Sequence, residues 1–113
     1  MKYRIDLLPT FIREAKRLKK RYASFVDDYE RFINELRTNP TAGNDLGGGL
    51  RKHRMRITSK SKGKRGGARV ITFTVIVSVE ETEIDLLYIY DKAERGSISR
   101  KELEGLLSKN GIK

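Results

Sequence analysis

The first residues of the chain alternate between charged and apolar side chains. Tyr3, Ile5 and Leu7 share one parity, and the positions between them carry charged side chains. This period of two is typical of a β-strand with one buried face. Pro9 lacks a backbone N–H, so we expect the strand to end there.

Residues 10–39 have the spacing of two amphipathic helices. We expect Thr10 to cap the first helix and Ser24 to cap the second, with Asp27 in the capping-box position. Asn39 and Pro40 end the second helix. The predicted apolar sides are Phe11, Ala15, Leu18 and Tyr22 in the first helix and Phe25, Tyr29, Phe32, Ile33 and Leu36 in the second.

A strand pattern returns after a glycine-rich loop at residues 41–49. From Leu50 onward one parity carries a row of cations, whereas the opposite parity is largely apolar. The first parity holds Leu50, Lys52, Arg54 and Arg56, and the second holds Arg51, His53, Met55 and Ile57. The apolar parity predicts which face of this strand is buried.

The second half of the chain predicts two more strands and a last helix. Residues 68–79 are mostly β-branched and apolar, as in a central strand covered on both faces. A turn at residues 80–81 leads to a strand over residues 84–90. Ser99 and Glu102 form a capping box for the last helix. The apolar contacts of this helix are Leu103, Leu106 and Leu107.

These elements predict an α+β fold in the order β-α-α-β-β-β-α. A small, antiparallel-rich sheet packs on the N-terminal helical hairpin. The 113 residues are expected to form one domain, residues 1–113.

Composition narrows the class of protein. Cysteine is absent, which excludes disulfides and thiolate metal sites. The opening residues are too charged for a signal peptide, and no apolar run reaches the roughly 20 residues of a membrane span. We therefore expect a cytoplasmic protein without a membrane partner.

Positive charge is concentrated in one segment. The net charge is +10, and nine of the 25 Lys and Arg residues lie between Arg51 and Arg69, where Asp and Glu are absent. The rest of the chain has 16 basic and 15 acidic residues. Such a local concentration favours a polyanionic partner such as nucleic acid.

The cationic row of the strand that begins at Leu50 is the sharpest candidate site. Residues two apart on a strand are separated by about 6 to 7 Å, close to the spacing of successive phosphates. Lys52, Arg54 and Arg56 can therefore follow an RNA backbone. A solvated row of surface charges is the alternative, and it is less favoured because cations without counter-charges repel one another.

The same row suits RNA cleavage. A base removes the proton of the ribose 2′-hydroxyl, the oxygen attacks the adjacent phosphorus, and cations neutralise the developing charge. Crowding by Arg54 and Arg56 disfavours the protonated form of Lys52, which makes Lys52 a candidate base. Binding without catalysis remains open at this point.

The loop at residues 59–67 is a candidate clamp for the phosphate backbone. Its glycines permit close backbone approach, and its cations suit sequence-independent contacts. The predicted nucleic-acid ligands are Lys60, Lys62, Lys64 and Arg65. An ordinary hairpin loop is the alternative.

Other candidate groups are weaker. His53 is the only histidine and lies on the core parity, so we expect a structural role for it. The acidic residues lie mainly on the helices and at residues 80–83, so no metal or other cofactor is expected. Tyr88, Tyr90 and Lys92 share a parity at the end of the last strand, where a tyrosine can stack on a base, donate a proton or cap the core.

Several features together resemble the RelE/ParE superfamily of toxins, particularly its RelE-like and HigB-like branch. They are Gly49-Leu50 before Lys52-x-Arg54-x-Arg56, a Gly-Lys-rich loop, Gly66-Gly67-Ala68-Arg69-Val70-Ile71, and Ile89-Tyr90-Asp91-Lys92 before a Ser-capped helix. The resemblance covers essentially the whole chain.

This resemblance implies a small antiparallel sheet on two helices. For the RelE-like branch it also implies a metal-free endonuclease that enters the ribosomal A site, cleaves mRNA and is masked by a cognate antitoxin. By position, Arg69 matches the arginine that contacts the scissile phosphate, and Lys92 matches the basic motif after the last strand. Two positions depart from the family pattern, with Ala93 in place of a basic residue and Ser99 in place of a tyrosine.

We therefore predict a toxin of a toxin–antitoxin system that acts as a ribosome-dependent mRNA endonuclease, or mRNA interferase. The predicted catalytic residues are Lys52, Arg54, Arg56, Arg69, Tyr90 and Lys92. The main alternative is a ParE-like inhibitor of DNA gyrase without enzymatic activity. A third is a toxin that has lost catalysis and only binds RNA or antitoxin.

Overall fold

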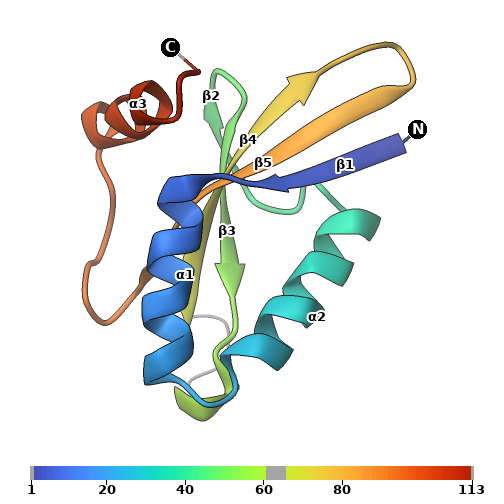
Figure 1. Cartoon of the computed structure of the whole chain (residues 1–113). Helices are drawn as coiled ribbons and strands as arrows, with labels where there is room; N and C mark the ends of the chain where they lie inside the picture. Colours follow the sequence, from blue (N-terminus) through green and yellow to red (C-terminus); the bar gives the residue numbers. More distant parts are fainter. Residues whose placement is uncertain (1, 61–65, 113) are drawn as a thin grey trace.

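The computed structural model describes residues 2–60 and 66–112 (Figure 1). Its elements in chain order are β1 (Lys2–Leu7), α1 (Pro9–Arg21), α2 (Phe25–Thr38), β2 (Asn44–Gly47), β3 (Leu50–Met55), the 3₁₀ turn η1 (Thr58–Lys60), β4 (Ala68–Ile76), β5 (Glu81–Asp91) and α3 (Arg100–Lys109).

The strands form one mixed sheet in the order β1-β5-β4-β3-β2. β1 runs parallel to β5, and the other three pairs are antiparallel. A parallel pair needs a long connection between its strands, and here everything from α1 to β4 lies between them in the chain. The predicted α+β class with a mostly antiparallel sheet is confirmed.

Each face of the sheet has its own apolar core. Val70 points into a cluster with Phe11, Leu18 and Phe32 of the N-terminal helices. Its neighbour Ile71 belongs instead to a cluster with three leucines of α3. Because successive residues of a strand point to opposite faces, the α1–α2 pair and α3 cover different faces. Figure 1 shows α3 set apart from that pair.

The loop predicted at residues 41–49 contains a short strand, so that prediction is wrong there. Asn44 and Asp45 of β2 pair with Lys52 and Arg51 of β3. The turn between the strands is built by glycines 47 to 49, whose φ angles of 85°, 60° and 86° disfavour other residues. β2 has no apolar alternation, which is why the hydrophobic pattern missed it.

The predicted cap of α1 is wrong, and Ser24 lies at the N-cap of α2 as predicted but without a side-chain capping bond. α1 begins at Pro9, and the Thr10 hydroxyl donates to the Leu87 carbonyl oxygen at 2.5 Å instead of capping the helix. The Ser24 hydroxyl donates to Asp28 at 2.7 Å and makes no capping bond. The capping box of Ser99 and Glu102 is confirmed. No helix in the described ranges is long and apolar enough to cross a membrane.

The β4–β5 hairpin differs from prediction at its tip. β4 ends at Ile76, which is 78% exposed, and Val79 is 92% exposed, so residues 76–79 are not part of a covered central strand. Glu81 begins β5 instead of forming the turn. Leu7 of β1 is also exposed, against the prediction that it is buried.

Candidate nucleic-acid interface

The basic residues of β3 lie on the sheet face opposite the α1–α2 pair. His53 and Met55, on the other parity, are buried, and the Phe32 ring of α2 lies against His53. Arg54 and Arg56 are exposed, and Lys52 is half-buried. The predicted division of this strand into a core face and a cationic face is confirmed.

Strand register brings further site residues onto the same face. Arg54 of β3 pairs with Arg69 of β4, and Arg69 pairs with Tyr90 of β5. In the adjacent row, Lys52 pairs with Ile71, and Ile71 pairs with Tyr88. Directly opposed residues share a face, so Lys52, Arg54, Arg69 and Tyr90 form one surface, which we call the cationic sheet face.

Arg69 and Tyr90 are the buried members of this face. Arg69 is 7% exposed and Tyr90 is 3% exposed. Burial, and then the charge of Arg54, lowers the pKa of Arg69. Burial raises the pKa of Tyr90, so its phenol keeps its proton at neutral pH. The Tyr90 hydroxyl has no hydrogen-bond partner among the described residues, which leaves a proton donor available.

Arg95 covers Tyr90 and was missed by the sequence reasoning. Its guanidinium carbon lies 5.7 Å from the centre of the Tyr90 ring, and the guanidinium forms an ion pair with Glu102 in the first turn of α3. The hydrogen bond to Glu102 raises the pKa of Arg95. A signal for Arg95 was available in the sequence. Ala93 stands where the family pattern has a basic residue, and Arg95 is a basic residue two positions later. The Lys92 ammonium donates to the Gly96 carbonyl at 2.6 Å, so Lys92 stabilises the turn that carries Arg95.

The family model described as the RelE toxin of the RelE/RelB toxin–antitoxin system matches residues 10–111. This chain belongs to the RelE toxin family. The match runs from α1 through α3 and therefore includes the whole cationic sheet face. RelE toxins pair with a RelB antitoxin and are typically endoribonucleases.

Lys60 of this RelE toxin has an internal partner. Its ammonium lies 2.6 Å from Asp91 Oδ1, and both side chains are largely buried. Asp91 also accepts a hydrogen bond from the Tyr22 hydroxyl. Burial alone would raise the pKa of Asp91, but the bonds from Lys60, Tyr22 and the Ala93 amide outweigh burial and lower it. A phosphate at Lys60 would have to compete with Asp91.

The remaining predicted clamp residues, Lys62, Lys64 and Arg65, lie outside the described residues. Gly67, at the end of the same segment, serves strand packing. A Cβ there would lie 2.2 Å from the Met55 carbonyl oxygen, so only glycine lets β4 begin this close to β3.

His53 has the structural position predicted for it. Its Nε2 lies 3.0 Å from the Thr72 hydroxyl, and the ring meets Phe32 edge-on. Burial, and then the charge of Arg51, lowers the pKa of His53 to about 4. The imidazole is therefore neutral at physiological pH and is directed away from the cationic sheet face.

A groove also lies between α2 and β3. Two hollows of about 390 and 450 Å³ are both lined by Phe32, Glu35 and Arg54. Lys52 also lines the first hollow and Arg56 the second, so the basic row that begins on β3 borders this groove as well as the cationic sheet face.

Proposed function

We propose that this RelE toxin is a cytoplasmic, ribosome-dependent mRNA endonuclease that needs no metal for catalysis. The observation that carries the proposal is the cationic sheet face, where register aligns Lys52, Arg54, Arg69 and Tyr90. A base, several cations and a protonated phenol are the groups that cleavage by the ribose 2′-hydroxyl requires.

Each group has a role in this reaction. Lys52 accepts the proton of the 2′-hydroxyl, and the freed oxygen attacks the adjacent phosphorus. Arg54 and Arg69 bind the phosphate oxygens, where negative charge increases in the transition state. Tyr90 donates its proton to the departing 5′-oxygen, giving a 2′,3′-cyclic phosphate and a free 5′-hydroxyl.

Flanking cations position the RNA. Arg56 continues the row of β3 and binds the next phosphate along the strand. Lys92 has three donors and uses one of them for the Gly96 carbonyl. Its remaining donors serve a phosphate on the Tyr90 side of the site.

Burial of Arg69 and Tyr90 supplies a physical reason for dependence on the ribosome. Free RNA does not reach these two side chains while Arg95 lies over the Tyr90 ring. Docking in the ribosomal A site displaces Arg95 onto phosphate and opens the pair to the mRNA. The RelB antitoxin opposes this step by covering the same cations with an acidic segment.

Induction of the toxin without antitoxin tests the proposal. Primer extension then compares a translated and an untranslated copy of one mRNA. Cuts confined to the translated copy support ribosome-dependent cleavage. Growth arrest with intact mRNA contradicts it and favours gyrase inhibition, whereas unimpaired growth contradicts it and favours a protein that only binds RNA or antitoxin.

A further inference from the structure

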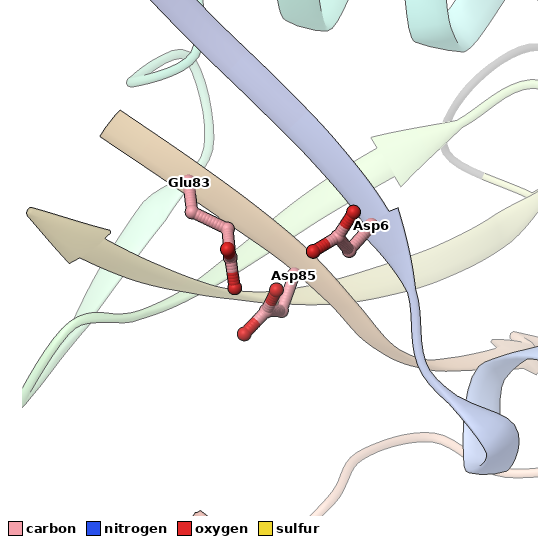
Figure 2. A group of neighbouring side chains, drawn as sticks. All are labelled: Asp6, Glu83 and Asp85. Carbon is pink, nitrogen blue, oxygen red and sulfur yellow. The ribbon is translucent and has the colours of Figure 1, made fainter. Parts of the chain in front are cut away.

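Three carboxylates meet where β1 pairs with β5. Asp6 lies opposite Asp85 in the parallel register, and Glu83 lies two residues earlier on β5. One ligand oxygen from each residue lies within 4.8 Å of the other two. Figure 2 shows the Asp85 carboxylate between those of Glu83 and Asp6. β4 separates this cluster from the basic strand β3.

Asp85 is the buried member of the cluster. It is 4% exposed, and its Oδ1 has no hydrogen-bond partner in the described part of the chain. A buried carboxylate oxygen without a partner loses its hydration and gains nothing in return. Two more carboxylates beside it increase the cost through repulsion.

Arg4 compensates only part of this negative charge. Its guanidinium forms an ion pair with Glu83 and lies 3.7 Å from Asp6 and 3.8 Å from Glu81. One positive charge thus serves several carboxylates, and the Arg4 side chain is 56% exposed. The Asp85 oxygen remains without a hydrogen bond despite this neighbour.

We propose that Asp6, Glu83 and Asp85 bind one divalent cation of the hard class, such as Mn²⁺, Mg²⁺ or Ca²⁺. An all-oxygen set without His or Cys suits these ions and disfavours zinc. The Asp6 side chain is 45% exposed, which leaves room for the water ligands that complete the coordination. The bound cation joins the edge strand β1 to β5 and has no part in RNA chemistry.

Direct binding to the full-length, chelator-treated chain tests this site. We expect one Mn²⁺ per chain by electron paramagnetic resonance, with a Kd of about 10⁻⁴ to 10⁻³ M, and a rise in Tm on adding Mn²⁺. Asp6→Asn and Asp85→Asn each weaken binding by about tenfold or more. Asp6 is partly exposed, so Asp6→Asn tests the site even if Asp85→Asn fails to fold.

Two further variants sharpen the experiment. Asp45→Asn changes an exposed carboxylate on β2 and leaves Mn²⁺ binding unchanged. Arg4→Met removes the positive charge that competes for the cluster, so it tightens binding. Absence of saturable binding, or equal binding by wild type and both Asp variants, overturns the proposal. Greater stability of Asp85→Asn in a protein that binds no Mn²⁺ also overturns it, because a shared proton then satisfies the cluster.

Discussion

Arg54 on β3 lies directly opposite Arg69 on β4. Like charges in directly opposed positions destabilise a sheet. Arg69 is also buried, and burial together with Arg54 lowers its pKa. Arg69 donates a hydrogen bond to the Ala68 carbonyl oxygen, and a phosphate bound by both guanidinium groups would offset their repulsion. We propose that this pair lowers the stability of the fold in favour of RNA binding.

Replacing Arg54 by Gln tests this exchange. We expect the free energy of unfolding to rise by about 0.5 kcal/mol, because the like-charge pair is removed. Cleavage of translated mRNA falls by about tenfold or more, because a charged phosphate ligand is lost. Urea unfolding and primer extension measure the two effects. Arg37→Gln changes an exposed arginine of α2 and alters neither. A loss of stability in Arg54→Gln contradicts the argument.

Different substitutions test the two proposed roles, Lys52 as the base and Arg69 as a phosphate ligand. We expect Lys52→Ala to remove the proposed base and abolish toxicity while leaving folding and antitoxin binding intact. Arg69→Lys keeps a charge in the buried position but loses the planar, two-pronged donor geometry, so cleavage falls by about tenfold or more. Growth after induction and antitoxin pull-down are the measurements. Full toxicity in both variants refutes the proposed site.

Lys60 provides a test between structure and RNA binding. Lys60→Met removes the nearer cation of the buried Asp91 carboxylate and leaves only Arg21, at 3.9 Å from Oδ2, and we expect the free energy of unfolding to fall by about 3 kcal/mol. Lys20→Met removes an exposed lysine and serves as the control. Unchanged stability with reduced cleavage in Lys60→Met supports the original prediction of a phosphate ligand instead.

Arg95 is expected to act on the site through Tyr90. Arg95→Met keeps an apolar cover over the Tyr90 ring but removes the guanidinium. Cleavage falls, while α3 keeps its helix because Ser99 and Glu102 still form both hydrogen bonds of the capping box, although Glu102 loses its ion pair with Arg95. Circular dichroism measures the helix content, and primer extension measures cleavage. Lys101→Met changes an exposed lysine in the first turn of α3 and leaves cleavage unchanged.

The local patterns of the sequence predicted most of this fold. Alternation in β3 separated the core side of His53 and Met55 from the cationic side, and helical spacing found the buried stripes of α1 and α2. Such patterns work because one buried face imposes a period on the chain. The pattern missed β2 because Leu46 is its only apolar residue, and the strand is recognised by its pairing with β3.

The features that were missed depend on residues far apart in the chain. The Lys60–Asp91 pair joins positions 31 residues apart, and the register of β1 with β5 places Asp6 beside Asp85. Hydrophobic periodicity fixes which face of a strand is buried, but it does not say which residue of β1 pairs with which residue of β5. The burial of Arg69, which is 7% exposed, was likewise hidden, because a basic residue on the cationic parity of a strand is expected to be exposed.

His53 predicts how stability changes in acid. Its pKa is about 4 in the folded protein and about 6.5 in the unfolded chain, so the unfolded state binds more protons between these values. Stability is therefore complete above pH 6.5 and decreases as the pH falls, with a loss of about 3 kcal/mol by pH 4. His53→Gln lacks this titration, so urea unfolding of both proteins from pH 4 to pH 7 isolates it. A wild-type minus variant difference that stays constant across this range contradicts a buried, neutral His53.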